Sequence, residues 1–249
     1  MKLIRFQYGE EIAFGMLQGS EIQVLVGPPT APLHVEKTLK LEDVSLLAPI
    51  LPTKIIGVGF NYKKHAEELH CKLPEEPLLL LKPPSSLNGP DEPIHLPPSS
   101  KQVEFEGELA IVIGKRCKHL SEAEVKEAIL GYACFNDVTA RDLQFKDVQF
   151  TRAKSFDTFS CFGPWIETEV DPSDLKLETR VNGEVKQSAR TSELRFSVPH
   201  LVSFISQVMT LEPGDVISTG TPGGTGPLKQ GDKVEVEIEG VGTLVNPVY

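Results

Sequence analysis

The sequence has no long apolar run, few cysteines and a shortage of basic residues. No hydrophobic stretch in its 249 residues approaches the roughly 18 residues that a membrane-spanning helix needs, so we expect no membrane partner. The four cysteines show no Cys-x-x-Cys spacing, which argues against a disulfide framework and against a zinc site. Charged residues interrupt the start of the chain, unlike a secretory signal, so a cytoplasmic location is the default expectation.

Acidic residues outnumber basic ones by 35 to 25, which gives a formal net charge of −10. A nucleic-acid partner or an anionic membrane needs a basic footprint, so this balance argues against both. It is compatible with a small anionic substrate, because a local cluster of lysine, arginine and metal can override the global field.

Gly and Pro breaks divide the first 50 residues into short strand-like pieces at 2–6, 12–17 and 21–26. This pattern predicts a small β-rich N-terminal domain, residues 1–50. An apolar strand at 54–59 then opens a larger domain, residues 51–249, that we expect to carry the catalytic site.

Strand signals outnumber helix signals in the larger domain. Asn182-Gly183 predicts a β-hairpin, and strands are expected at 216–219, 234–238 and 241–248. Two helices are predicted: one from a capping box of Ser121 and Glu124 to about residue 131, and one over about 199–209 after Ser197. The fold class is therefore α+β, mostly β, rather than alternating βαβ units.

Glu106 and Glu108 stand two residues apart where a polar segment becomes an apolar strand. Side chains at i and i+2 point to the same side of a strand, so an apolar strand would carry the pair toward the interior; a solvated strand end is the alternative. Buried carboxylates need a counter-charge, and Mg²⁺ or Mn²⁺ suits all-oxygen ligation better than zinc. Asp137, after the apolar 131–135, is a candidate third ligand; an ordinary capping Asp is the alternative.

His65 and Glu68 would lie one turn apart if Asn61 caps a short helix. A carboxylate beside an imidazole makes it a better base, although an exposed, charged helix face is the simpler interpretation. Lys154 and Lys82 have a similar ambiguity, between a desolvated cation that holds a substrate oxyanion and a surface lysine.

Two further segments could contact a ligand. Arg141 and Gln144 stand three residues apart and would share a helix face, with a salt-bridged Arg as the alternative. The glycine-rich stretch 219–226 is neither a P-loop nor G-x-G-x-x-G, which excludes nucleotide binding. It could instead offer backbone N–H groups and a hydroxyl to a carboxylate.

Taken together and in order, these segments resemble the fumarylacetoacetate hydrolase superfamily, in particular its bacterial acylpyruvate hydrolase and 2-hydroxyhepta-2,4-diene-1,7-dioate isomerase-like members. The matching segments are 59–68, 81–83, 105–109, 136–144, 154–159, 163–165 and 219–222. The resemblance covers about residues 50–249, and the first 50 residues resemble the small N-terminal domain of bacterial members. It implies a mixed β-sheet roll with peripheral helices, a metal in a cleft, and a homodimer.

The resemblance also implies a role for each candidate residue. Glu106, Glu108 and Asp137 would hold one Mg²⁺ or Mn²⁺. His65 with Glu68 would activate water, on a segment that tends to close as a lid. The residues expected around the substrate are Lys154, Arg141 and Gln144 at its oxygens, Thr221 at its carboxylate, and Lys82 as a further binding residue.

The activity implied is metal-dependent cleavage of a C–C bond in an acylpyruvate-type β-diketo acid, a small anionic 2-oxo acid. Isomerisation of 2-hydroxyhepta-2,4-diene-1,7-dioate and decarboxylation of oxaloacetate are rivals that use the same residues. A catalytically silent, ligand-binding protein on this fold is the alternative from a different class.

Overall fold

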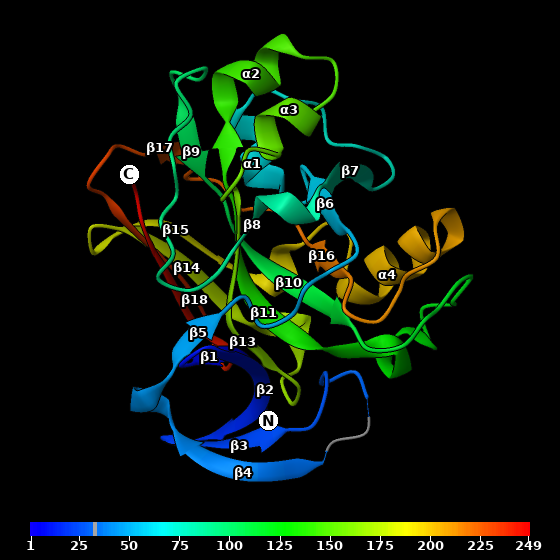
Figure 1. Cartoon of the computed structure of the whole chain (residues 1–249). Helices are drawn as coiled ribbons and strands as arrows, with labels where there is room; N and C mark the ends of the chain where they lie inside the picture. Colours follow the sequence, from blue (N-terminus) through cyan, green and yellow to red (C-terminus); the bar gives the residue numbers. More distant parts are fainter. Residues whose placement is uncertain (32–33) are drawn as a thin grey trace.

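The computed structural model describes residues 1–31 and 34–249, and within them most strands join one large mixed sheet (Figure 1). Neighbouring strands in this sheet are, in spatial order, β4 (Val35–Lys40), β3 (Glu21–Leu25), β2 (Glu11–Gln18), β1 (Lys2–Tyr8), β13 (Ser160–Glu167), β11 (Ile129–Asp137), β10 (Gly107–Ile113), β16 (Val216–Ser218), β6 (Ile55–Gly59) and β7 (Leu78–Lys82). Two short strands lie beside this path, β5 (Ser45–Leu47) on β1 and β8 (Leu87–Asn88) on β13. The chain is mostly β, as predicted.

Smaller sheets and short helices surround the large sheet (Figure 1). One sheet contains β12 (Thr139–Ala140), β9 (Val103–Phe105) and β17 (Gly226–Pro227), and another contains β15 (Glu184–Arg190), β14 (Lys176–Val181), β18 (Lys233–Ile238) and β19 (Gly242–Pro247). The α-helices are α1 (Lys63–Glu68), α2 (Arg141–Lys146), α3 (Thr151–Lys154) and α4 (Val198–Val208). Short 3₁₀ turns occupy Leu41–Asp43, Pro84–Ser86, Val125–Ala128, Pro172–Asp174 and Thr191–Glu193. No helix in the described ranges is long and apolar enough to cross a membrane.

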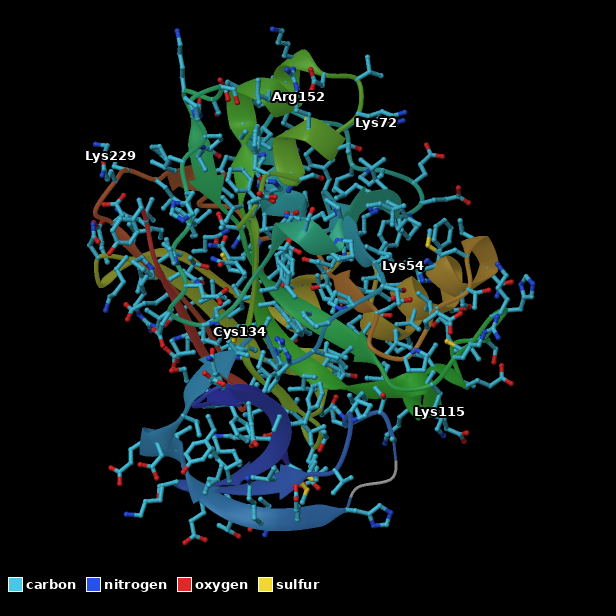
Figure 2. All side chains as sticks on the ribbon, viewed as in Figure 1. Lys54, Lys72, Lys115, Cys134, Arg152 and Lys229 are labelled. Atoms are coloured by element: carbon cyan, nitrogen blue, oxygen red, sulfur yellow. The ribbon has the colours of Figure 1, made fainter. Side chains whose placement is uncertain are left out.

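The centre of the molecule is the antiparallel pair β10 and β11, which is buried on both faces. Leu109 and Ile111 point into a core shared with α4 and the sheet of β14, β18 and β19. Ala110 and Val112 point into a second core on the other face. Cys134 lies at this centre (Figure 2), and the cysteines of the described residues are all free thiols. A pair of strands buried in this way can carry polar groups inward only at its ends, which is where the candidate site lies.

The N-terminal strands curl around a small core of their own but are not detached from the rest (Figure 1). Strand β1 pairs with β2 and β5, and its first residues also pair with β13, with Lys2 opposite Glu167 and Leu3 opposite Ile166. The N-terminal segment therefore extends the large sheet.

The helix predicted at 199–209 and the hairpin at Asn182-Gly183 are both confirmed. The Ser197 hydroxyl accepts the His200 N–H at the start of α4, which buries one apolar face. Asn182 and Gly183 both have positive φ, 54° and 81°, as a tight turn between β14 and β15 requires.

The helix predicted from Ser121 to about residue 131 is wrong. The capping box exists, since Ser121 donates from its backbone N (2.9 Å) and hydroxyl (2.6 Å) to Glu124. Only a 3₁₀ turn over Val125–Ala128 follows, and Ile129 already begins β11. The apolar run after Ile129 is long enough for a buried strand with partners on both sides, and this pairing overrides the local capping signal.

Asn61 does not cap α1 through its side chain, contrary to prediction. The N-cap is Tyr62, without a side-chain bond, while the Asn61 amide bonds the backbone of Phe196 and Thr219. Asn61 thus fixes the start of α1 to two distant segments.

Candidate functional site

The three predicted metal ligands lie together at one end of the central strand pair. Glu106 occupies the break between β9 and β10, Glu108 follows on β10, and Asp137 ends β11. The β10–β11 register sets Gly107 opposite Asn136, and the Asn136 side chain accepts the Glu106 N–H at 2.9 Å. One oxygen from each carboxylate lies within 4.8 Å of the others, and all three side chains are buried. Such a group of hard oxygen ligands could hold a metal ion.

Two buried lysines neutralise part of this acidic group. Lys154 Nζ lies 2.7 Å from Glu106 Oε2 and 2.6 Å from Asp137 Oδ2. Lys82 Nζ pairs with the other oxygen of Asp137 and donates to the Phe159 carbonyl at 2.9 Å. The surface-lysine alternative is therefore wrong for both residues. Lysines such as Lys72, by contrast, lie on the periphery (Figure 2).

Arg141 is held behind the acidic group by three partners. Its Nε donates to Glu104 Oε2 at 2.8 Å, and its two terminal nitrogens donate to Glu106 and to the Gln144 amide oxygen. Sequence reasoning missed Glu104, although the alternation of Glu104, Glu106 and Glu108 in the sequence was the available signal.

The buried charges do not balance. Four carboxylates, Glu104, Glu106, Glu108 and Asp137, face three cations, Lys82, Lys154 and Arg141. Burial opposes ionisation of Glu106, but Lys154 and Arg141 outweigh it and lower the pKa of that carboxyl. At Glu108, burial and then the Asp137 charge raise the pKa to about 8.

Glu108 is therefore the carboxylate that lacks a cationic partner, although Ser218 and the Gly220 N–H (2.7 Å) donate hydrogen bonds to it. A divalent cation beside Glu106, Glu108 and Asp137 would supply that charge, so the residues present fit such an ion.

His65 enters the same region from α1 and is buried. Burial lowers the pKa of its imidazole, and although Glu106 opposes this shift, Arg141 and Lys154 add to it. The ring is therefore neutral at pH 7. Its Nδ1 lies 3.8 Å from Glu68 Oε2 and has no hydrogen-bond partner among the described residues.

Glu68 is more exposed than His65 and instead accepts the Gly224 N–H at 3.0 Å. The predicted pair is thus on one helix face but not hydrogen-bonded. The Phe60 ring stacks on His65, with ring centroids 5.9 Å apart, and Phe150 meets Phe60 edge-on.

A narrow pocket joins these groups, with a polar side and an apolar side. Its polar lining consists of His65, Glu106, Glu108, Gln144, Lys154 and Thr221. Its apolar lining consists of Val58, Gly59, Phe60, Leu80 and Phe150. The other predicted residues, Glu68, Lys82, Asp137 and Arg141, contact this group from behind or from the rim. A wider groove beside Tyr132 and Val170 is lined by none of the predicted site residues.

The Thr221 hydroxyl bonds the protein on two sides. It donates to the Gly107 carbonyl at 3.0 Å and accepts from Gln187 Nε2 at 2.8 Å. Gln187 comes from β15, in a different sheet, and carries no local motif, so sequence reasoning missed it.

Two family models together match nearly the whole chain. The C-terminal domain of fumarylacetoacetate hydrolase matches residues 54–249, and an N-terminal domain described as Rv2993c-like matches residues 1–49. The chain belongs to the fumarylacetoacetate hydrolase family.

Relatives within the family differ in their named reactions. A 5-carboxymethyl-2-hydroxymuconate delta-isomerase from Mycobacterium smegmatis is 47% identical, with a TM-score of 0.94 over 100% of this chain and 99% of the other. A fumarylacetoacetate hydrolase from Exiguobacterium antarcticum is 39% identical, with a TM-score of 0.91 over 100% and 99%. The mitochondrial oxaloacetate tautomerase of Rattus norvegicus is 42% identical over 83% of this chain and 70% of its own. Members of this family are enzymes, and the reaction type varies among them.

Proposed function

We propose that this protein is a divalent-metal-dependent enzyme that transfers a proton on a small anionic 2-oxo acid, as in keto–enol tautomerisation or a double-bond shift. The observation that carries the proposal is the neutral, buried His65 imidazole, which shares one pocket with the acidic group and has an unpaired Nδ1 among the described residues.

Glu106, Glu108 and Asp137 would hold Mg²⁺ or Mn²⁺, since both ions accept the same oxygen ligands. When bound, the cation supplies Lewis acidity that stabilises negative charge on the substrate's 2-oxygen. Lys154 and Gln144 line the same pocket and can donate hydrogen bonds to substrate oxygens. A divalent ion would also make the buried group net positive, which favours an anionic ligand.

The proton step follows from the state of His65. A neutral ring nitrogen can take a proton from carbon 3 of a 2-oxo acid, while the electron pair of that C–H bond forms the carbon–carbon double bond of the enolate. Returning the proton to the 2-oxygen gives the enol, and returning it to another carbon gives an isomer. Glu68, 3.8 Å from Nδ1, favours the transient imidazolium.

Two of the three relatives described above support proton transfer as the first candidate. The tautomerase and the delta-isomerase are named for such reactions, at 42% and 47% identity.

Hydrolysis of an acylpyruvate is the second candidate, because the His65 imidazole, with Glu68 3.8 Å from Nδ1, could act on a water molecule instead of on carbon 3. The same imidazole would then take a proton from water, whose oxygen attacks the distal carbonyl. Cleavage of the C–C bond would release pyruvate and a carboxylic acid. The hydrolase at 39% identity belongs to this class.

Two further outcomes, decarboxylation of oxaloacetate and the absence of any catalytic activity, would be detected by the same assays. We also propose a homodimer, to be measured by light scattering.

The test is a panel of oxaloacetate, an acylpyruvate and a 2-hydroxy-diene dioate, each assayed with Mg²⁺, with Mn²⁺ and with excess chelator. Loss of carbon-3 hydrogens to D₂O reports proton transfer, while pyruvate and CO₂ report cleavage. Asp137→Asn should abolish turnover in a folded protein, with the exposed Asp157→Asn as its matched control. Full activity in chelator would refute the metal dependence, and turnover without carbon-3 exchange would refute proton transfer.

A further inference from the structure

The Gln187 side chain connects the two backbone segments that flank the pocket. Its Oε1 accepts the Gly107 N–H at 2.9 Å, and Gly107 stands between the candidate ligands Glu106 and Glu108. Its Nε2 donates to the Thr221 hydroxyl and to the Pro222 carbonyl, both at 2.8 Å. The side chain is fully buried, so these are its hydrogen bonds in place of water.

The orientation of this amide is fixed by its partners. The Gly107 N–H can only donate and the Pro222 carbonyl can only accept, so Oε1 must face Gly107 and Nε2 must face Pro222. In a flipped amide, Nε2 would face the Gly107 N–H, a donor against a donor, and Oε1 would face the Pro222 carbonyl, an acceptor against an acceptor. The group that meets Thr221 is therefore a donor.

This arrangement determines in which direction the Thr221 hydroxyl can donate. Because Gln187 donates to Oγ1, the hydroxyl hydrogen must point elsewhere, either to the Gly107 carbonyl, where it lies now, or to a ligand in the pocket. An ionised carboxylate offers only acceptors, so it is bound by a hydroxyl that donates.

We infer that Gln187 is a positioning residue that keeps the Thr221 hydroxyl a donor and braces it against the peptide between Glu106 and Glu108. The carboxylate of the 2-oxo acid is the ligand that benefits, and this part of the inference rests on the proposed function.

Close packing supports the brace. Strand β15, which carries Gln187, lies directly against the 219–226 loop: a Cβ on Gly224 would come within 2.2 Å of the Lys186 carbonyl. On the other side, a Cβ on Gly107 would lie 2.0 Å from Thr179 Oγ1, and Thr179 is the cross-strand neighbour of Gln187. Both segments therefore pack directly against the strand pair that carries Gln187 and Thr179.

The deciding variant is Gln187→Glu, which preserves size and the acceptor for Gly107 but removes the donor. The Thr221 hydroxyl would then donate to the new carboxylate and turn its lone pairs toward the substrate. We expect KM for the 2-oxo acid, and Kd for oxalate in the presence of Mg²⁺, to rise about tenfold or more, the scale of one charged hydrogen bond. We expect kcat to change by about twofold or less, since no reacting atom is touched.

The mode of action is tested by a double-mutant cycle with Thr221→Val. Once the hydroxyl is absent, Gln187→Glu should cause no further rise in KM. Thr179→Val is the matched control, because its buried hydroxyl has no hydrogen-bond partner among the described residues and it should bind oxalate normally. Additive effects in the cycle, or unchanged oxalate binding by folded Gln187→Glu, would overturn the inference.

Hydrogen exchange needs no ligand, so it tests the role of Gln187 even if Gln187→Glu does not fold or the proposed function is wrong. Gln187→Met should speed hydrogen exchange in peptides containing Gly107 and Thr221 more than Thr179→Val does; equal exchange would overturn the brace. Failure of wild-type protein to bind oxalate with Mg²⁺ would overturn the proposed function, and the exchange result would still decide the role of Gln187.

Discussion

Lys154 Nζ lies 2.7 Å from Oε2 of Glu106, inside the group of carboxylates that could hold a cation. The same nitrogen contacts Asp137, so one ammonium group neutralises two candidate ligands. Burial lowers the pKa of Lys154, but the Asp137 and Glu106 charges outweigh it and the net shift is upward. Lys154 is thus charged in the folded protein and offsets part of the negative charge of the site.

Lys154→Met should destabilise the metal-free protein strongly, because Glu106 then keeps only Arg141 and Asp137 keeps only Lys82 as a cationic partner in a buried group already short of positive charge. Breaking a buried ion pair in this way costs about 3–5 kcal/mol. Mg²⁺ should restore part of the loss. Urea unfolding with EDTA and with Mg²⁺ measures both effects, with the exposed Lys72→Met as control. Equal unfolding midpoints for the two variants in EDTA would contradict the prediction.

Binding of Mg²⁺ should release a proton from Glu108 near neutral pH. Burial and Asp137 raise the pKa of this carboxyl to about 8 from the ordinary 4.5. Between these values the metal-free native state binds more protons than the unfolded chain, so this group's stabilising contribution falls as pH rises. Calorimetric titration in buffers of different ionisation enthalpy measures the released proton, and Glu108→Gln should abolish the release. Buffer-independent heats for the wild type would exclude this linkage.

The acid limb of the pH–rate profile should lie below the ordinary histidine value of about 6.5, because burial lowers the pKa of His65. Glu68 opposes this shift, so Glu68→Gln should move the limb to still lower pH. His65→Asn should reduce kcat by about 10²–10⁴-fold. Glu67→Gln, on the exposed side of the same helix, is the control. A limb at 6.5 or above in the wild type would argue against His65 as the base.

Stability should respond to His65 in the same pH range. The unfolded chain binds this proton near pH 6.5 and the folded protein only at lower pH, so stability falls as pH drops through that window. His65→Asn should flatten this part of the stability curve, measured by urea unfolding at several pH values.

Gly107→Ala should weaken Mg²⁺ binding although Gly107 offers no side chain. The added Cβ would lie 2.0 Å from Thr179 Oγ1, so the backbone between Glu106 and Glu108 must shift. Overpacking of this kind typically costs about 1–3 kcal/mol. Thr179→Ala removes the clashing atom and should restore binding in the double variant. Normal Mg²⁺ affinity in the single variant, measured calorimetrically, would show that the site tolerates a shift of the backbone between Glu106 and Glu108.

Local patterns predicted where the acidic residues lie, whereas the family resemblance supplied the roles of the site residues. The i, i+2 spacing of Glu106 and Glu108 beside an apolar strand placed them on one face, and Asp137, at the end of the next apolar run, was a candidate third ligand that a capping Asp explained equally well. The helix α4 and the Asn182-Gly183 turn were equally local signals.

Features that depend on distant partners could not be read in the same way. Ile129 belongs to a strand because β10 and β13 lie on either side of it, and its own neighbours suggested a helix. Gln187 and Asn61 act across segments that are far apart in sequence. Whether Lys82 and Lys154 are buried depends on the carboxylates that surround them, which no flanking residue reveals.

The pairing of β1 with β13 also decides which backbone edge of the large sheet is covered. Strands β1 and β8 each cover part of β13, on the side away from β11. Without residues 1–49, the backbone groups around Ile166 and Glu167 would be open to a strand from another molecule, the usual origin of edge-to-edge aggregation. Removal of the N-terminal strands should therefore expose this edge of β13 and lower the solubility of the protein.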